Sequence, residues 1–340
     1  MSAPLAGPLD RLGRPVRDLR LSVTDRCNFR CPYCMPRTVF GPDHPFSPRS
    51  ELLTYEELTR VVAIFAALGV SKVRLTGGEP LLRRDLEALV AMIAATPGID
   101  DIAITTNGSL LAGRAEALRA AGLHRVTVSL DSLDPAVFAA MADTRISLDT
   151  VLDGIAVARD VGLAPIKLNA VVQRGVNDEG LLDLAGYARA NGDLLRFIEY
   201  MDVGTSNGWV RDQVVPAAEI IERINAVHPL EPVPAATRGE VAQRWRYVDG
   251  GGEIGVISSV TQPFCTDCTR ARMTATGELF TCLFATHGRD VRALLRGGAS
   301  DEEIRDQISE VWSARSDRYS ELRSAATVDA PRAEMSYLGG

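Results

Sequence analysis

Runs of β-branched and aliphatic residues alternate with amphipathic stretches between about residues 18 and 203. The runs predict six strands, at Leu19–Val23, Lys72–Thr76, Ile102–Thr106, Arg125–Leu130, Ile166–Val172 and Leu195–Tyr200. The stretches between them predict helices at Thr54–Leu68, Asp85–Ala95, Gly113–Ala121, Leu148–Val161 and Asn177–Ala190, the first of which opens with a capping-box pattern. This alternation predicts a parallel sheet with right-handed crossovers, and six strands are too few for the eight of a closed barrel.

The remaining third of the chain has a different pattern. Pro229–Arg238 is rich in proline and alanine and is predicted to be a linker. Two hairpins and two helices should follow, the hairpins at Arg244–Val248 with Glu253–Ser258 and at Arg272–Thr274 with Glu278–Cys282, the helices at Asp290–Arg296 and Asp301–Ala314. The polar C-terminal residues are expected to be irregular. We therefore divide the chain into two domains, 10–205 and 206–340.

Composition places the chain among ordinary globular proteins. Charged residues make up 24% of it and hydrophobic residues 46%, and its formal net charge is −7. This negative charge argues against general binding to nucleic acid or to anionic membranes. The sequence has no apolar run near the ~20 residues of a membrane-spanning helix and no signal-peptide pattern at its N-terminus. We therefore expect a cytoplasmic protein, homodimeric or monomeric, with no nucleic-acid or membrane partner.

All six cysteines fall into two groups of three. The first triad is Cys27, Cys31 and Cys34, with the spacing C-x3-C-x2-C, and the second triad is Cys265, Cys268 and Cys282, with the spacing C-x2-C-x13-C. Thiolates this close together can hold a soft metal centre, either zinc or an iron–sulfur cluster. A closed structural zinc site takes four ligands, whereas a cluster held by three keeps one iron open. Disulfide bridges are the alternative, but tight clustering and the lack of an export signal argue against them.

The first triad follows the first predicted strand, at the end where parallel α/β folds bind ligands. Its pattern, with Tyr33 before the last cysteine, resembles the radical S-adenosylmethionine superfamily. The resemblance implies an incomplete (β/α)6 TIM-like barrel, closed on its open side by a smaller C-terminal α+β domain. It also implies a [4Fe–4S] cluster that cleaves S-adenosylmethionine to a 5′-deoxyadenosyl radical. A structural zinc knuckle is the alternative for these cysteines, although a fourth ligand is missing.

Three polar loops after later predicted strands support this interpretation. They are Thr76-Gly77-Gly78-Glu79-Pro80, Thr105-Thr106-Asn107-Gly108 and Val128-Ser129-Leu130-Asp131. Glycine lets the backbone approach a ligand closely, and short polar side chains can bind ribose and carboxylate groups. Taken singly, each loop would be an ordinary strand–helix connection or a helix cap. The resemblance assigns S-adenosylmethionine contacts to Tyr33, Gly78, Ser129 and Met201.

The second triad narrows the resemblance from the superfamily to one family within it. The segment Phe264–Arg272, with Cys282-Leu283-Phe284 after it, is similar to the C-terminal cluster motif of the GTP 3′,8-cyclase family. Other similar motifs are Leu19–Arg26, Arg196–Met201, Ile257–Val260 and Met335–Gly340. The resemblance implies a lyase that converts GTP to 3′,8-cyclo-7,8-dihydro-GTP, the first step of molybdenum cofactor (molybdopterin) biosynthesis. It also implies a second [4Fe–4S] cluster, whose open iron holds the guanine ring edge.

A triphosphate substrate requires clustered cations, and arginine forks match phosphate oxygens. The resemblance assigns the GTP site to Arg20, Arg74, Thr105, Lys167, Arg270, Ala271 and Arg272. It gives a catalytic part to Arg20, Arg270 and Arg272, and to a Gly339-Gly340 tail that reaches back into the substrate cavity. A disordered tail is the alternative for the two glycines. The resemblance further implies a reductant such as flavodoxin or ferredoxin, and a cyclic pyranopterin monophosphate synthase that takes the product.

Two positions depart from the family pattern. Thr269 stands where the motif usually has asparagine, and Gly239-Glu240-Val241 stands where it has Gly-Pro-Ala, but neither departure touches a cysteine or an arginine. Two other functions stay open: a peptide-modifying radical S-adenosylmethionine maturase with an auxiliary cluster, and a two-cluster electron-transfer protein. The first would leave the arginines without a triphosphate, and the second would not need Gly77-Gly78-Glu79-Pro80.

Overall fold

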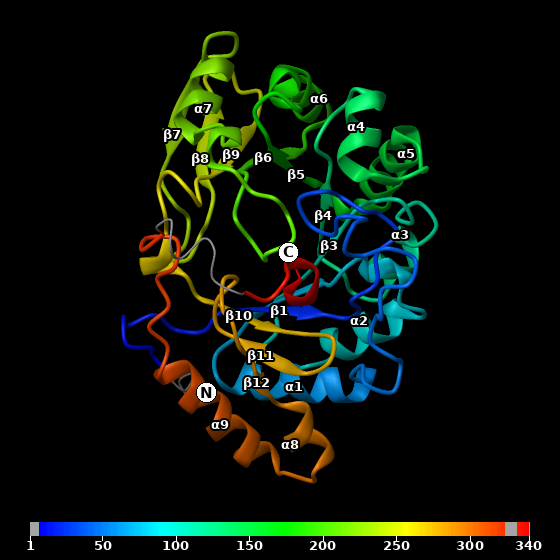
Figure 1. Cartoon of the computed structure of the whole chain (residues 1–340), viewed down its shortest axis with the longest axis vertical. Coiled ribbons are helices and arrows are strands. Elements are labelled where there is room, and N and C mark those ends of the chain that lie inside the picture. Colours follow the sequence, from blue (N-terminus) through cyan, green and yellow to red (C-terminus); the bar gives the residue numbers. More distant parts are fainter. Residues whose placement is uncertain (1–6, 324–331, 340) are drawn as a thin grey trace.

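The structure is a computed structural model of the chain that describes residues 7–323 and 332–339. One twelve-stranded sheet curves around its centre, and the helices cover its outer face (Figure 1). Six parallel strands form the middle of this sheet: β1 (Asp18–Ser22), β2 (Lys72–Thr76), β3 (Asp101–Thr106), β4 (Arg125–Ser129), β5 (Lys167–Val172) and β6 (Leu194–Glu199). Each strand pairs with the next in chain order. The predicted parallel, incomplete barrel is confirmed.

The helices between these strands are crossovers. They are α1 (Tyr55–Ala67), α2 (Leu86–Ala94), α3 (Ala115–Ala120), α4 (Pro135–Ala142), α5 (Leu148–Ala158) and α6 (Leu181–Asn191). The capping box predicted at Thr54 is present, because the Thr54 hydroxyl accepts from the Glu57 N–H while the Glu57 carboxylate accepts from the Thr54 N–H. Helix α4 was not predicted, because its residues are nearly all apolar and show no amphipathic period.

The C-terminal strands extend the same sheet at both edges. They are β7 (Leu230–Val233), β8 (Gln243–Tyr247), β9 (Glu253–Ile257), β10 (Arg270–Met273), β11 (Glu278–Phe280) and β12 (Arg289–Asp290). Their helices are α7 (Ala217–Asn225), α8 (Arg292–Arg296), α9 (Asp301–Ser313) and α11 (Met335–Leu338). Strand β10 pairs in parallel with β1, and β9 pairs in parallel with β6. Both predicted hairpins are confirmed, as β8–β9 and β10–β11. The domain boundary after residue 205 stays a prediction.

Two expectations for the C-terminal part are wrong. The segment expected to be a linker contains β7, which pairs with β8 at the edge of the sheet. An edge strand tolerates Pro232 because one side of its backbone needs no ladder partner. The final residues, expected to be irregular, contain α11, whose Leu338 is fully buried. A buried leucine anchors this short helix despite its polar surroundings.

The core lies between the sheet and the outer helices. Side chains alternate between the two faces of a strand, so Leu19 and Leu21 of β1 are fully buried in the hydrophobic core with Phe65 of α1. Arg20, between the two leucines, lines the cavity on the opposite face. The same alternation in β2 and β10 directs polar side chains inward, and it gives the barrel its polar interior.

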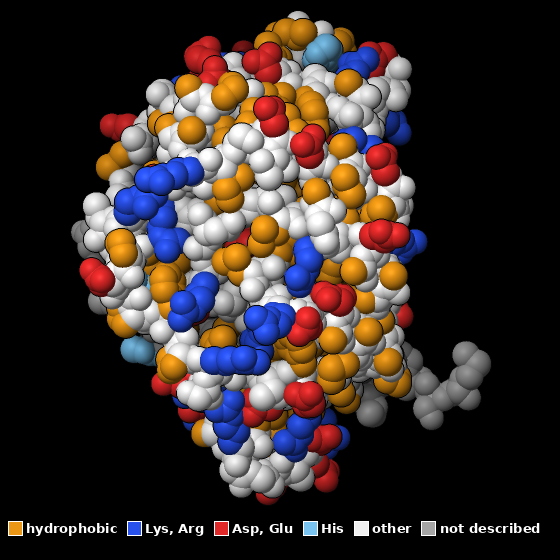
Figure 2. Space-filling model, turned by 90° about the vertical axis from the view of Figure 1, so that its right-hand side faces the viewer, with side chains coloured by type: hydrophobic (Ala, Val, Ile, Leu, Met, Phe, Trp, Pro, Cys, Tyr) orange, Lys and Arg blue, Asp and Glu red, His pale blue; other side chains and the backbone are white. Residues whose placement is uncertain are grey.

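The surface is unevenly charged. On the face shown in Figure 2, lysine and arginine side chains gather mainly on the left half, whereas acidic side chains lie mainly along the top and the right. Within the described ranges, no helix is long and apolar enough to cross a membrane.

One buried carboxylate ties the central strands to the C-terminal part. Glu199, at the end of β6, has no exposed surface, and one of its oxygens accepts from the Ala217 N–H at 2.8 Å, at the start of α7. Its other oxygen accepts from the N–H groups of Val260 and Thr261, at 2.8 and 2.9 Å. These charge-assisted hydrogen bonds fix α7 and the loop after β9 against the barrel.

Replacing Glu199 with alanine should therefore destabilise the fold. The change leaves several buried N–H groups without an acceptor, and we expect the free energy of unfolding to fall by about 3 kcal/mol or more. Urea unfolding followed by circular dichroism measures this loss. Glu222→Ala, at an exposed position of the adjoining helix α7, is the matched control and should change little. Equal losses for the two variants would contradict the anchoring role of Glu199.

Candidate active site

Both cysteine triads face the main cavity of the barrel. All six cysteines line it, together with side chains from β1, β2, β3, β4, β5, β6 and β10. All six thiols are unbridged, so the disulfide alternative finds no support in the structure. The sequence places these two triads at opposite ends of the chain, and the pairing of β10 with β1 brings them to one space.

The first triad lies on a loop braced by Arg30. The Arg30 guanidinium donates to the carbonyl oxygens of Cys27 at 2.7 Å and Phe40 at 2.6 Å. Within the loop, the Cys34 N–H donates to the Cys31 carbonyl at 3.0 Å. The loop that carries the three thiols is therefore held by hydrogen bonds within the protein, which do not depend on a bound group.

Burial disfavours the thiolate form of all three thiols in the first triad. Burial raises the pKa of Cys27 to about 11, and burial with nearby thiols raises the pKa of Cys31 and Cys34 well above the ordinary range. A positive metal centre must displace these protons, as thiolate ligands require. In the described part of the chain, no three His, Cys, Asp or Glu side chains converge as ligands of a single ion. In a cluster each of the three thiolates binds its own iron, whereas a closed zinc site needs a fourth ligand on the same ion.

The two glycines after β2 allow the next loop to pack on the cysteine loop. A Cβ at Gly77 would lie 2.3 Å from the Thr24 carbonyl oxygen, and one at Gly78 would lie 2.3 Å from the Arg26 carbonyl oxygen. The Gly78 N–H donates to Thr24 O at 2.9 Å. Gly77 also has φ +136°, a conformation open to glycine. Both glycines are therefore required by backbone contact, whatever they do for a ligand.

Glu79 and Asp131 organise the loops instead of offering free carboxylates. Glu79 is fully buried and accepts from the Thr106 hydroxyl at 2.8 Å and the Asn107 N–H at 2.7 Å, and burial raises its pKa to about 7. Asp131 accepts from the Tyr33 hydroxyl at 2.7 Å, and burial raises its pKa to about 6. Both oxygens of Glu79 therefore already have donors within the protein.

The four residues predicted to bind S-adenosylmethionine all line the cavity. They are Tyr33, Gly78, Ser129 and Met201. They come from the cysteine loop and from the ends of three strands, β2, β4 and β6, and thus surround the first triad from several sides. Their binding role stays a prediction.

Three arginines stand side by side across β10, β1 and β2. Arg20 is the register partner of Arg272 on one side and of Arg74 on the other. Paired strands lie about 4.8 Å apart, so the three backbones hold the guanidinium stems in a row. Arg270 lies two residues before Arg272 and faces the same cavity. The sheet register itself therefore builds this cationic site.

The arginine row holds positive charge without enough acceptors. Burial, followed by the charges of Arg272, Arg270 and Arg74, lowers the pKa of Arg20 well below its usual value. Burial and Arg270 lower the pKa of Arg272 to about 10. The buried Nε atoms of Arg20, Arg74 and Arg270 have no hydrogen-bond partner among the described residues. Buried donors of this kind call for a ligand with many acceptor oxygens and negative charge.

The remaining predicted GTP residues differ in position. Thr105 lines the cavity and accepts from Arg74 Nη1 at 3.2 Å. Lys167 is 7% exposed and lies outside the cavity lining, where burial and Arg196 lower its pKa to about 6. Ala271 is buried in the hydrophobic core, so its side chain faces away from the cavity and only its backbone is available. The roles of all three stay predictions.

Arg196 is a cavity residue that the predicted site left out. It lies between Leu195 and Phe197 of β6, both fully buried in the core, and therefore points to the opposite face. Strand alternation alone could have identified it. Burial and Arg74 lower its pKa to about 10, so it adds to the same cationic interior.

The second triad surrounds the β10–β11 hairpin. Cys265 and Cys268 lie in the turn before β10, and Cys282 follows β11. Burial would raise the pKa of Cys268, but Arg270 and Arg315 lower it to about 6. Burial, with Asp317 as a lesser cause, raises the pKa of Cys282 to about 12. A guanidinium-stabilised thiolate beside two further thiols suits a metal cluster in the same way as the first triad.

Gly339, near the C-terminus, lies beside side chains of β1, β2 and β10. Gly339 accepts through its carbonyl from Arg272 Nη1 at 2.6 Å, and a Cβ there would lie 2.0 Å from Thr76 Oγ1. Its φ of +70° also favours glycine. The alternative of a disordered tail therefore does not hold for Gly339, whereas Gly340 lies outside the described residues. A catalytic part for either glycine stays a prediction.

Comparison with known proteins assigns both parts of the chain. Residues 21–188 match the Radical SAM superfamily, and residues 194–321 match the Molybdenum Cofactor Synthesis C family. A GTP 3′,8-cyclase of Acidothermus cellulolyticus is 59% identical over 339 residues, which cover 97% of this chain and 94% of the relative. A GTP 3′,8-cyclase of Xanthomonas axonopodis pv. citri is 50% identical over all of both chains.

The fold also has a relative among solved structures. The crystal structure of methylornithine synthase superposes with a TM-score of 0.51 over 91% of this chain and 85% of the other, at 17% identity, and so shows a shared fold alone. The sequence matches cover nearly the whole chain at 50–59% identity, so they show the family and not only the fold. The chain therefore belongs to the GTP 3′,8-cyclase family, within the radical S-adenosylmethionine superfamily.

Proposed function

We propose that the chain catalyses the cyclisation of GTP to 3′,8-cyclo-7,8-dihydro-GTP, the first step of molybdenum cofactor biosynthesis. The observation that carries this proposal is the row of arginines on β10, β1 and β2, which faces the same cavity as both cysteine triads. A row of cations with unused donors fits a triphosphate, which offers acceptor oxygens in line. The family to which the chain belongs has this activity.

The chain's own residues bind and orient the substrates in this proposal. The first triad holds a [4Fe–4S] cluster, with S-adenosylmethionine beside Tyr33, Gly78, Ser129 and Met201. When bound, these groups supply the 5′-deoxyadenosyl radical chemistry on which the cyclisation depends. The arginine row holds the triphosphate, which fixes the ribose relative to the first triad, and the enclosed barrel keeps water from the reacting atoms.

The second triad and the partners complete the proposal. Cys265, Cys268 and Cys282 would hold a second [4Fe–4S] cluster, which would help to bind the guanine base of the substrate. A carrier such as flavodoxin or ferredoxin delivers the electrons, and cyclic pyranopterin monophosphate synthase takes the product. We place the protein in the cytoplasm, as a monomer or homodimer, because six unbridged thiols suit a reducing compartment.

The two alternative functions explain less of the structure. A peptide-modifying maturase has no use for a row of buried guanidinium groups with unpaired Nε atoms. An electron-transfer protein needs no enclosed cavity beside its clusters. Family membership argues against both.

The two triads should be separable by mutation. Cys31→Ser should remove about half of the iron and abolish cleavage of S-adenosylmethionine, because a cluster held by three thiolates loses one of its ligands. Cys268→Ser should spare the first cluster and S-adenosylmethionine binding but end GTP cyclisation. Iron analysis, 5′-deoxyadenosine and cyclised product are measured on each variant after anaerobic reconstitution. Full iron content in either variant would show that the assigned cysteines are not ligands.

The arginine row should bind the triphosphate. Alanine at Arg20, Arg74, Arg270 or Arg272 should weaken GTP binding by about 1–3 kcal/mol, the range for a lost charge-assisted contact. Guanosine, which lacks phosphates, should bind the wild type and these variants nearly alike. Calorimetry with both ligands is the measurement, and Arg174→Ala, at an exposed arginine outside the cavity lining, is the control. Equal losses for GTP and guanosine would show that the arginines support the fold and not the phosphates.

Gly339 should matter through its backbone. Gly339→Ala places a Cβ against Thr76 Oγ1 and Ser22 Oγ, so the tail must leave its position beside Arg272. We expect GTP cyclisation to fall by orders of magnitude, while the melting temperature and the iron content stay close to wild type. Deleting Gly339 and Gly340 should have the same effect. Gly186→Ala, in α6 with open space around it, is the control. Wild-type turnover in the truncated chain would refute a catalytic part for the tail.

A further inference from the structure

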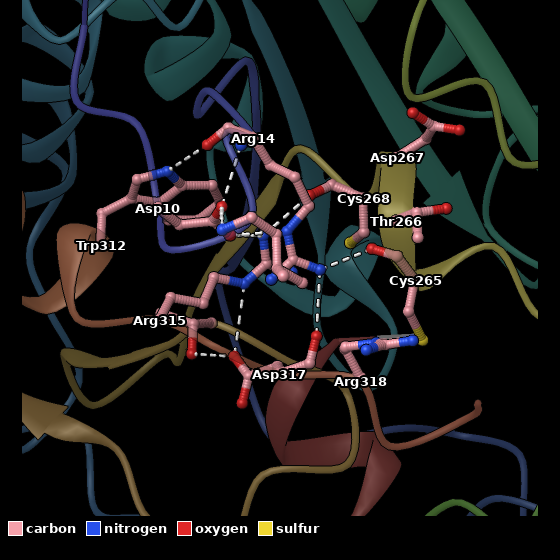
Figure 3. A network of polar contacts seen from close by, with 12 residues as sticks. Asp10, Arg14, Cys265, Thr266, Asp267, Cys268, Trp312, Arg315, Asp317 and Arg318 are labelled. Carbon is pink, nitrogen blue, oxygen red and sulfur yellow. Dashed lines mark hydrogen bonds and ion pairs between the residues drawn. The ribbon is translucent and has the colours of Figure 1, made fainter. Parts of the chain in front are cut away.

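Two buried arginines lie behind the second triad and hold its loop by the backbone (Figure 3). Arg14 has no exposed surface, and its Nη1 donates to the carbonyl oxygen of Cys265 at 2.5 Å. Arg315 is 4% exposed, and its Nη1 donates to the carbonyl oxygen of Cys268 at 2.8 Å. Two of the three cysteines in this triad are thus each fixed by a separate guanidinium.

The same network reaches the third cysteine through Asp317. Asp317 Oδ2 accepts from the hydroxyl of Thr281, the residue before Cys282, at 2.6 Å. It also accepts from Arg315 Nε at 3.3 Å, and the Asp317 carbonyl accepts from Arg14 Nη1 at 3.0 Å. All three cysteine-bearing segments are therefore joined by side chains that are not themselves cluster ligands.

Asp10 and Trp312 anchor the two arginines. Asp10 Oδ2 accepts from Arg14 Nε at 2.6 Å and from Arg315 Nη1 at 3.3 Å. The Trp312 ring donates through Nε1 to the Arg14 carbonyl at 2.9 Å, and the Arg315 guanidinium lies 4.6 Å from the centre of that ring. The anchors come from both ends of the described chain, so the network takes its position from the tertiary fold and not from the cysteine loop.

One donor in this network is left over. Arg14 Nη2 is buried and has no hydrogen-bond partner among the described residues, and both Arg14 and Arg315 line the cavity that the second triad faces. Leaving a buried guanidinium N–H unpaired costs free energy, so such a donor indicates an acceptor that the protein itself does not supply. Sulfide and thiolate sulfur atoms accept N–H hydrogen bonds, and such bonds with nearby positive charge set the reduction potential of an iron–sulfur cluster.

We propose that Arg14 and Arg315 are positioning residues of the second cluster, which fix its cysteine loop through the backbone and set its reduction potential through N–H donors and positive charge. This inference rests on the second cluster of the proposed function. It assigns a role to two residues that lie about 250 and 50 positions from Cys265 in sequence. It also predicts that the effect of charge can be separated from the effect of geometry. A lysine keeps the positive charge but cannot make the paired hydrogen bonds of a guanidinium group.

The test uses full-length chains in which Cys27, Cys31 and Cys34 are serine, so that only the second triad binds iron. Arg14→Gln, Arg315→Gln, Arg14→Lys and Arg315→Lys are made in this background and reconstituted anaerobically. Spectroscopic redox titration gives the reduction potential, and a chelator gives the rate of iron release. Arg238→Gln is the matched control, because Arg238 is exposed and pairs with Asp267 of the same loop.

Both glutamine variants should titrate at a more negative potential than the parent, since a lost cation disfavours the added electron, and should release iron several-fold faster. The lysine variants should keep a potential near that of the parent but still release iron faster, because a single ammonium group cannot replace the fork. Arg238→Gln should match the parent in both measurements. A glutamine variant that fails to fold leaves its lysine counterpart to decide the geometric part.

Two opposite results are distinguishable. A parent chain that binds no iron at the second triad would refute the second cluster of the proposed function, and the role of the two arginines with it. A parent with a normal cluster, but with an unchanged potential and release rate in all four variants, would refute only the arginine role.

Discussion

The parallel pairing of β10 with β1 is the contact on which the rest of the site depends. It extends the sheet beyond β1 with a strand from the C-terminal part, and it brings Cys265 and Cys268 to the same cavity as the first triad. Its register also sets Arg272 beside Arg20, which β1 in turn sets beside Arg74. A slip of one residue would turn Arg272 toward the helices and Met273 into the cavity. The position of the second triad and the order of the arginine row therefore both depend on one strand pair.

This register has an electrostatic consequence. Like charges on neighbouring strands disfavour the folded state, and burial lowers the pKa of Arg20 and Arg272 further. The chain offsets part of this repulsion with the Gly339 carbonyl on Arg272 and with the hydroxyls of Thr105 and Thr127 on Arg74. These uncharged acceptors pair with guanidinium N–H groups but do not neutralise the positive charge of the arginine row. The proposed triphosphate would supply the negative charge that these neutral acceptors lack.

Sequence patterns predicted the parts of the site that local rules determine. Cysteine spacing together with strand ends was sufficient to place the first triad, whereas Arg20 was assigned by resemblance and its position between Leu19 and Leu21 explains why it lines the cavity. Local rules could not show that the Glu79 carboxylate accepts hydrogen bonds from Thr106 and Asn107, because these bonds depend on how two loops pack together. Nor could they show Arg14 and Arg315 behind the second triad, since those contacts join segments from opposite ends of the chain. The strand β7 was missed because a proline such as Pro232 usually indicates that a segment is not a strand. Only at the edge of a sheet, where β7 lies, is a proline tolerated within a strand.

The network behind the second triad also orders events during synthesis. The first-triad loop bonds to Asn107, Asp131 and Ala142, but its Tyr33 also packs with Tyr200, and Met335 packs against the same small cluster. The second triad needs Asp10 and Arg14 from the start of the chain and Trp312, Arg315 and Asp317 from near its end. Both sites therefore take contacts from late in the chain, but the second also needs residues from its beginning. During synthesis Asp10 and Arg14 are made long before their partners, so the supports of the second triad are complete only when Asp317 has been added.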